Sequence, residues 1–165
     1  MQVYYSQDIR EEELKMRVSQ DWFSTFDTAH IVGNIDFCVS FKSDQALFEL
    51  PSLLWGEAKA GIRHSLYHSL VQLILTIGKA HTFDKHLPPL YLTAFDAAEI
   101  AFLPYHTIQS IFYQNDFNWN VLPSDHNSKE FLLLLELVEK TIYRHIIKIE
   151  KKLQKSVEIL YFIKS

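Results

Sequence analysis

The spacing of apolar residues changes at residue 61 from that of strands to that of a helix. Over residues 33–41 apolar side chains occupy every second position, as in a strand with one buried face. Residues 53–59 form a second apolar segment that is compatible with an extended strand, and Gly61 ends it. From residue 62 to residue 81 apolar side chains recur every three or four positions, which indicates a helix. This order predicts an α/β fold class with a central mixed β-sheet flanked by helices.

The two predicted strands carry charged side chains on defined faces. Asp36 lies on the face of the first strand opposite to its alternating apolar residues, which are Ile35, Phe37, Val39 and Phe41. In the second strand Glu57 and Lys59 are two positions apart, so both point to the same side as Leu53 and Trp55. We therefore expect Glu57 and Lys59 to be neighbours in space.

The remaining elements follow from spacing and turn residues. They are a helix over residues 6–22, a short strand over 47–50, a hairpin of strands 91–95 and 100–103, a short helix over 105–114 and a loop over 115–127. The stripe expected to pack the first helix consists of Ile9, Leu14, Met16 and Val18. The helix of residues 62–81 has a second, polar stripe whose simplest interpretation is a solvated face, namely Ser65, His68, Gln72, Thr76 and Lys79.

A long C-terminal helix is predicted over residues 128–164, because apolar residues keep helical spacing there and no Gly or Pro interrupts them. Asn127 is the expected N-cap, with Glu130 in the capping-box position. Such a helix would be roughly 55 Å long, more than a compact domain of this size needs. We therefore divide the chain into a core of residues 1–127 and a helix of residues 128–165 that leads to a domain absent from this chain.

Composition narrows the class of protein. The chain has 165 residues, 16 basic and 20 acidic side chains and a net charge of −4, which argues against a wholly basic nucleic-acid-binding surface but not against a local basic groove. A single cysteine, Cys38, excludes an internal disulfide, and no signal-peptide pattern or run of 18 apolar residues occurs. We expect a soluble cytoplasmic protein with no membrane association.

Asp36 and Glu57 suit divalent metal chemistry if their strands are adjacent. Two carboxylates and a backbone carbonyl, such as that of Ala58, are oxygen ligands of the kind that Mg²⁺ prefers, and Mn²⁺ can substitute. A lysine beside the metal-bound water, here Lys59, can orient or activate it and stabilise the charge that develops at phosphorus. This arrangement serves phosphodiester hydrolysis.

These residues resemble the active-site motif of the PD-(D/E)xK nuclease superfamily, which places an Asp on one strand and Glu-x-Lys on the next. The matching residues are Asp36 and Glu57-Ala58-Lys59, and Gly33 to Asp36 resemble the Gly-x-x-Asp form of the first motif. The resemblance implies a restriction-endonuclease-like core, a metal-dependent deoxyribonuclease and DNA as its partner. It also makes Gln72 a further candidate, although the tyrosine that some members carry four residues later is Thr76 here, and no Pro precedes Asp36.

A wider stretch, about residues 5–150, is similar to the N-terminal nuclease region of fused restriction-modification proteins, which also contain an adenine-specific DNA methyltransferase. The strings that carry this likeness are WGEAKAG, SLVQLILTIGKA, TFDKHLPPLYLTAFD and FNWNVLPSD. The only candidate for a methyltransferase motif, Leu87-Pro88-Pro89-Leu90-Tyr91, lacks the Asn or Asp before its prolines. The resemblance implies a nuclease module whose methyltransferase and target-recognition domains are absent from this chain.

Alternatives remain for each candidate residue. Without the resemblance, the simplest interpretation of Glu57 and Lys59 is an ion pair on a solvated sheet, with Asp36 a polar residue near a turn. The apolar residues beside them argue against it, because they indicate a buried strand. Glu12 and Glu13 of the first helix have two interpretations. Both are solvated, or one of them adds a carboxylate to the metal site, and Glu13 is then our candidate. His64 and His68 have the spacing of a zinc pair, but no third ligand accompanies them.

Two further expectations concern partners. Basic side chains near the predicted site are candidates for phosphate contacts or ordinary surface charges, namely Arg63, Lys79, His81 and Lys85. The alternative function is a catalytically inactive, nuclease-like interaction domain. It would use the apolar stripe from Phe131 to Leu160 to bind a partner or to form a homodimer.

Overall fold

The computed structural model describes residues 5–42, 52–61, 65–142 and 146–148. In this part of the chain five strands form one sheet in the order β1-β2-β3-β4-β5. The strands are β1 (Phe37–Ser40), β2 (Ser52–Ala58), β3 (Tyr91–Phe95), β4 (Glu99–Pro104) and β5 (Ile146–Lys148). The helices are α1 (Glu11–Trp22), α2 (Leu66–Ala80), α3 (Thr82–Lys85) and α4 (Lys129–Ile142), with two short 3₁₀ helices, η1 (Tyr105–Thr107) and η2 (Gln109–Tyr113). The α/β class and the mixed sheet are confirmed.

The sheet is mixed because it combines one parallel pair of neighbouring strands with antiparallel pairs. β2 and β3 pair in parallel, and α2 makes the crossover between them, as parallel neighbours require. The other neighbouring pairs are antiparallel. The predicted hairpin of β3 and β4 is confirmed, and the buried Asp96 carboxylate closes its turn by accepting hydrogen bonds from the N–H groups of Ala98 and Glu99.

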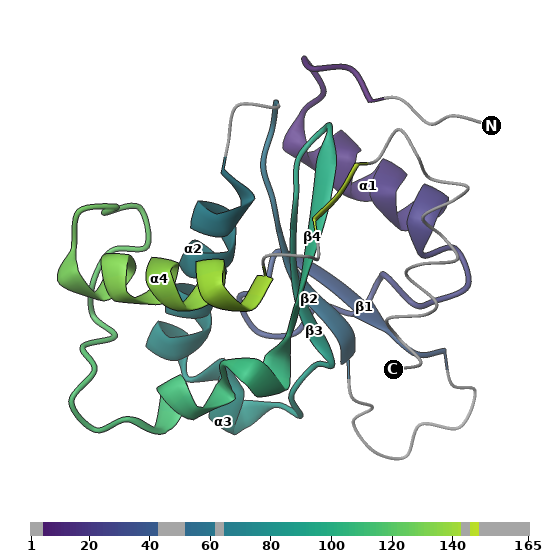
Figure 1. Ribbon diagram of the computed structural model, residues 1–165. Helices are drawn as coiled ribbons and strands as arrows, with labels where there is room; N and C mark the ends of the chain where they lie inside the picture. Colours follow the sequence, from purple (N-terminus) through teal and green to yellow (C-terminus); the bar gives the residue numbers. More distant parts are fainter. Residues whose placement is uncertain (1–4, 43–51, 62–64, 143–145, 149–165) are drawn as a thin grey trace.

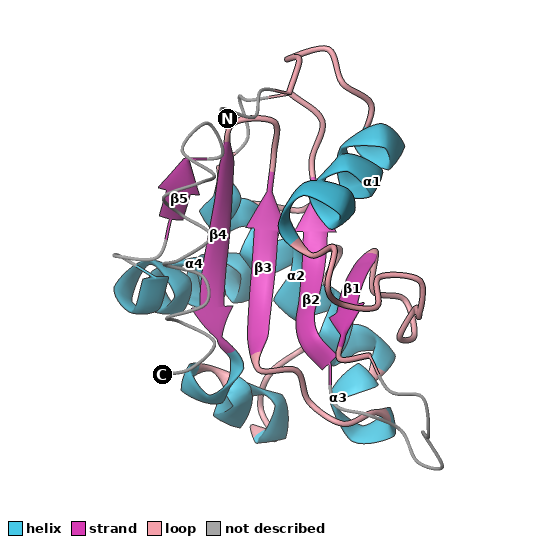
Figure 2. Cartoon of the chain, turned by 90° about the vertical axis from the view of Figure 1, so that its right-hand side faces the viewer, coloured by secondary structure: helices cyan, strands magenta, loops and turns pink. Residues whose placement is uncertain are grey.

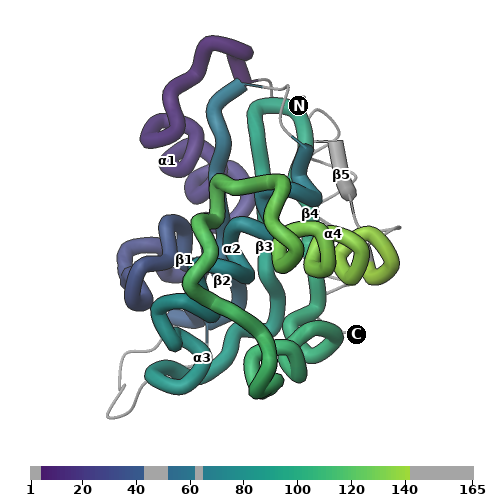
Figure 3. Tube along the Cα trace, turned by 90° about the vertical axis from the view of Figure 1, so that its left-hand side faces the viewer, coloured from purple at the N-terminus to yellow at the C-terminus, as the bar shows by residue number. Residues whose placement is uncertain are grey.

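Helices cover both faces of the sheet (Figures 1 and 2). α1 lies on one face, where Leu14 and Val18 are completely buried. α2 and α4 lie on the other face, with α4 packed on α2 (Figure 3). The strands are therefore buried on both sides, which explains why β1 is buried at every position although its sequence alternates.

Local signals set the limits of α2. The Ser65 hydroxyl caps its N-terminus by accepting a hydrogen bond from the His68 N–H at 3.5 Å. His81 ends it in the left-handed conformation, φ 53°, and its N–H donates to carbonyls of the last turn. The apolar stripe predicted for this helix is buried from Leu66 to Ile77, whereas its first predicted residue, Ile62, lies outside the described residues.

The prediction of one continuous helix over residues 128–164 is wrong in the part that the structure describes. α4 ends at Ile142, and residues 146–148 form β5, which pairs with β4. The open edge of β4 offers unpaired backbone groups, and the β-branched Ile146 and Ile147 suit a strand, so tertiary pairing overrides the helical spacing. The rest of the predicted helix, residues 149–165, lies outside the described residues.

Several smaller expectations are also corrected. The cap of α4 is Ser128, whose hydroxyl accepts from the Phe131 N–H at 3.1 Å, and not Asn127. Residues 105–114 form two 3₁₀ helices instead of one helix. Met16 of the first predicted stripe is exposed. The short strand expected at residues 47–50 lies outside the described residues. None of the described helices is long and apolar enough to cross a membrane.

Candidate functional site

Asp36 and Glu57 meet where β1 begins and β2 ends. The antiparallel register begins with Phe37 paired with Gly56. Asp36, in the bend directly before β1, and Glu57 are each the next residue beyond this pair, so the pairing of the two strands brings them into the same region. The Asp36 charge acts on Glu57, since it raises the pKa of that carboxyl. The predicted convergence of the two strands is thus present.

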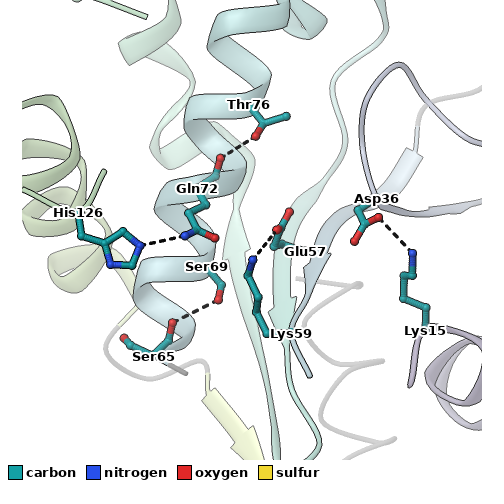
Figure 4. A network of polar contacts seen from close by, with 9 residues as sticks. All are labelled: Lys15, Asp36, Glu57, Lys59, Ser65, Ser69, Gln72, Thr76 and His126. Carbon is teal, nitrogen blue, oxygen red and sulfur yellow. Dashed lines mark hydrogen bonds and ion pairs between the residues drawn. The ribbon is translucent and has the colours of Figure 1, made fainter. Parts of the chain in front are cut away.

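Glu57 and Lys59 form the ion pair that their spacing predicts. The Lys59 Nζ lies 3.2 Å from the Glu57 Oε1, and the two side chains are 25% and 20% exposed (Figure 4). Both project to the side of β2 that α2 covers, as Trp55 does. The pair is therefore shielded by the domain core on one side, unlike an ordinary surface ion pair.

The environment of Glu57 works against its negative charge. Burial raises the pKa of this carboxyl, Lys59 lowers it by charge and hydrogen bond, and the charges of Asp36 and Glu11 raise it again, with a net increase. The charges of Asp36 and Glu11 thus act on Glu57, whose own close cation is Lys59. A cation bound beside Glu57 and Asp36 would offset the repulsion between these carboxylates.

The Ala58 carbonyl points toward the same place. The Lys59 N–H donates to the Phe95 carbonyl of β3 at 3.0 Å. In a trans peptide the C=O and the N–H point in opposite directions, so the Ala58 C=O points to the other side of β2, where β1 pairs. The register of β1 and β2 begins at Phe37 and Gly56, and Ala58 lies beyond it. Asp36, Glu57 and Ala58 therefore offer oxygen atoms on one edge of β2.

α1 contributes two charged residues that sequence reasoning missed. The Lys15 Nζ lies 3.1 Å from the Asp36 Oδ1 and 2.6 Å from the Glu12 Oε1. Burial lowers the pKa of Lys15, but its hydrogen bonds to Glu12 and Asp36 outweigh burial and raise it. The α1 carboxylate that acts on Glu57 is Glu11, whereas the candidate Glu13 is exposed.

A signal for these residues exists in the sequence. Positions 11, 14, 15 and 18 share one face of a helix, and Leu14 and Val18 on that face are completely buried against the sheet. Lys15 therefore lies beside the packed face of α1, whereas Glu11 is exposed at the start of the helix. The stripe that we assigned from the sequence included Met16 instead, which concealed this pattern.

Gln72 lies on α2, the helix that covers the face of the sheet to which Glu57 and Lys59 project (Figure 4). Its Nε2 is 2.9 Å from the Nε2 of His126, which comes from the segment before α4. The His126 ring stacks on His68 and Phe131, with ring centroids 5.0 and 4.5 Å apart. The polar stripe of α2 is therefore not a simple solvated face. His126 contacts His68 and Gln72, and Lys79 is the one residue of the stripe that is exposed.

The candidate phosphate contacts lie elsewhere. α2 runs back along the sheet, so Lys79 in its last turn and Lys85 on α3 lie toward the end of the sheet opposite to Lys59 (Figure 1). His81, exposed, lies 3.9 Å from the Asp84 carboxylate. Arg63 and His64 lie outside the described residues. Thus the structure does not bring Lys79 or Lys85 to the carboxylates.

The donor set fits a hard divalent cation in part. Two carboxylates and one carbonyl supply oxygen ligands, which Mg²⁺ accepts, and this ion usually retains several water ligands. Over residues 5–42, 52–61, 65–142 and 146–148, no group of three or more His, Cys, Asp or Glu side chains is placed to hold a metal. The site therefore fits a water-rich Mg²⁺ or Mn²⁺ ion and not an ion that needs a full set of protein ligands, such as structural zinc.

Comparison of this chain with protein-family models, with curated proteins and with solved structures finds no match. The chemistry of the site must therefore be argued from its own geometry.

Proposed function

We propose that this protein is a Mg²⁺-dependent DNA endonuclease. One observation carries the proposal: Asp36 and Glu57 converge at the ends of two neighbouring strands, and the Lys59 ammonium lies 3.2 Å from the Glu57 carboxylate. The carboxylates of Asp36 and Glu57 provide ligands for a divalent ion. The ammonium of Lys59 provides a positive charge beside the attacking water. The same residues carry the resemblance to the PD-(D/E)xK nucleases, and we propose a restriction-endonuclease-like core.

Each residue has a distinct role in the proposed hydrolysis. Asp36, Glu57 and the Ala58 carbonyl hold the ion, which supplies Lewis-acid polarisation of the phosphate when bound. Lys59 orients the attacking water and stabilises the negative charge that develops on the phosphate oxygens. A bond forms between the water oxygen and phosphorus, and the proton lost by the water passes to solvent. The bond from phosphorus to the leaving sugar oxygen breaks, and this oxygen takes up a proton from solvent to become a hydroxyl. Gln72, on the helix that covers the Lys59 side of β2, is a candidate for positioning the water.

The proposed biological setting is a restriction-modification system in the cytoplasm. The similarity of residues 5–150 to the nuclease region of fused restriction-modification proteins supports it, and methyltransferase and target-recognition domains would then lie outside this chain. Lys79 and Lys85 stay candidate DNA contacts only if a duplex extends along α2 toward α3. At about 1.5 Å per residue, Lys79 lies roughly 10 Å along the helix axis from Gln72, a span that a bound duplex covers easily.

The test is relaxation of supercoiled plasmid at high protein concentration with Mg²⁺ or Mn²⁺. We expect cleavage by the wild type, no cleavage with a chelator, and a loss of about 100-fold or more in Lys59→Ala, by analogy with removal of one charge-stabilising group from an active site. Lys129→Ala, which removes an exposed lysine of α4, is the matched control and should cleave like the wild type. Equal cleavage by Lys59→Ala and wild type would refute the role of Lys59.

The alternative is an inactive interaction domain that uses α4. The structure modifies this idea, because Phe131, Leu134 and Val138 are buried in the domain core and the exposed apolar residues of α4 are Leu132 and Leu133. These two leucines would form the partner or dimer contact. Light scattering of wild type and the Leu132→Ser, Leu133→Ser double variant tests it: a dimer that the variant abolishes, together with no metal-dependent cleavage, would favour this function.

A further inference from the structure

Lys15 connects three parts of the fold at the proposed metal site. Its helix, α1, packs on the sheet face opposite to α2, yet its ammonium reaches Asp36 before β1 at 3.1 Å. The Lys15 side chain is only 15% exposed, whereas that of its second partner, Glu12, is 87% exposed. The Asp36 side chain is 40% exposed, and its contact with Lys15 is the one that joins α1 to the segment before β1, since Glu12 lies on α1 itself.

Two lysines thus neutralise the two candidate metal ligands. Lys15 pairs with Asp36 and Lys59 pairs with Glu57, so each carboxylate has one close ammonium (Figure 4). Without these cations the adjacent carboxylates would repel each other in a partly buried place. A divalent ion bound between them would supply the same compensation, and Lys15 and the ion would then compete for the Asp36 oxygen atoms.

We propose that Lys15 is a built-in counter-ion of the site, which holds Asp36 in the metal-free protein and is displaced from it by the divalent ion. This inference rests on the proposed function, because it assumes that Asp36 binds metal. Lys59 differs from Lys15 in its task, since it stays beside the reacting phosphate while Lys15 leaves Asp36. The Glu12 carboxylate, three residues before Lys15 on α1, already lies 2.6 Å from its Nζ and keeps this ion pair after release from Asp36.

The first test measures Mn²⁺ affinity by titration calorimetry in the absence of DNA. Removing a competing, partly exposed ion pair should tighten binding roughly fivefold in Lys15→Gln. Lys129→Gln is the control, because it makes the same change in net charge at an exposed position of α4. This variant should bind Mn²⁺ like the wild type. Unchanged or weaker binding by Lys15→Gln would overturn the proposal. Absence of binding by every protein, wild type included, would refute the proposed metal site itself and this inference with it.

The second test uses the wild-type protein and so does not depend on the folding of a variant. Amine acetylation of each lysine is followed by peptide mass spectrometry with and without saturating Mg²⁺. We expect faster labelling of Lys15 when Mg²⁺ is bound, because its ammonium has left Asp36, and an unchanged rate at the exposed Lys129. A Lys15 rate that Mg²⁺ leaves unchanged, in protein that binds the ion, would show that Lys15 stays on Asp36 and would overturn the proposal.

Discussion

The Lys59 ammonium lies 3.2 Å from the Glu57 carboxylate near the end of β2, and β2 pairs there with the start of β1, which follows Asp36. A lysine paired with an acid in this place is arranged both to stabilise the metal-free fold and to serve a metal-bound reaction. Experiments on the metal-free protein measure the contribution of Lys59 to stability. Experiments on the metal-bound protein measure its contribution to the reaction.

The metal-free protein should depend on Lys59 for stability. Lys59→Ala leaves the mostly buried Glu57 carboxylate without its close cation, so we expect a loss of about 1–2 kcal/mol in the free energy of unfolding. Glu57→Gln removes the buried charge as well and should cost less. Urea unfolding of both variants in the presence of a chelator measures the difference. A larger loss in Glu57→Gln than in Lys59→Ala would contradict the importance of this pair.

Divalent ions should stabilise the protein through Asp36. An ion that binds only the folded state adds about 1.4 kcal/mol of stability at ten times its dissociation constant. We expect Mg²⁺ to raise the unfolding temperature of the wild type and of Asp116→Asn, an exposed acid that serves as the control, but not that of Asp36→Asn. An identical rise in all three proteins would mean that the ion acts elsewhere.

His68 should titrate below the usual range for histidine. Burial lowers the pKa of its ring, the charge of His126 lowers it further, and Glu139 opposes the shift. Because the folded-state pKa is below the unfolded value of about 6.5, the stability that neutral His68 contributes is present above pH 6.5 and is lost as the pH falls through the folded pKa. NMR titration of the His68 ring measures the shift. In His126→Gln the His68 pKa should move back toward its usual value, and no movement would exclude a contribution from His126.

Gly78 should not tolerate a side chain. A Cβ at this position of α2 would overlap the Trp119 ring, so alanine forces the ring and its segment away. We expect Gly78→Ala to lower the free energy of unfolding by about 1–3 kcal/mol, the usual cost of overpacking. The neighbouring exposed Lys79→Ala should change it by less than about 0.5 kcal/mol. Chemical denaturation with tryptophan fluorescence follows both, and a stable Gly78→Ala would show that the Trp119 segment moves freely.

Much of the sheet was predictable because its signals are local. β2, α2 and the β3–β4 hairpin follow from apolar spacing and from the turn at Asp96, and the Glu57–Lys59 pair follows from a spacing of two residues on a strand. The prediction for α1 was only partly right, since its helix was expected but its buried face was assigned with Met16 instead of Lys15. That error hid the one residue that links α1 to Asp36.

The sequence by itself determined the α/β class, the order of the central elements and the placement of Glu57, Ala58 and Lys59 at the end of one strand. Each of these depends on neighbours along the chain. Only the tertiary structure decided that Lys15 reaches Asp36, that His126 covers Gln72, and that residues 146–148 leave the helical pattern to pair with β4. These contacts join residues that are far apart in sequence. Their free energy comes from burial, charge compensation and the unpaired backbone of a sheet edge, which exist only once the chain has folded.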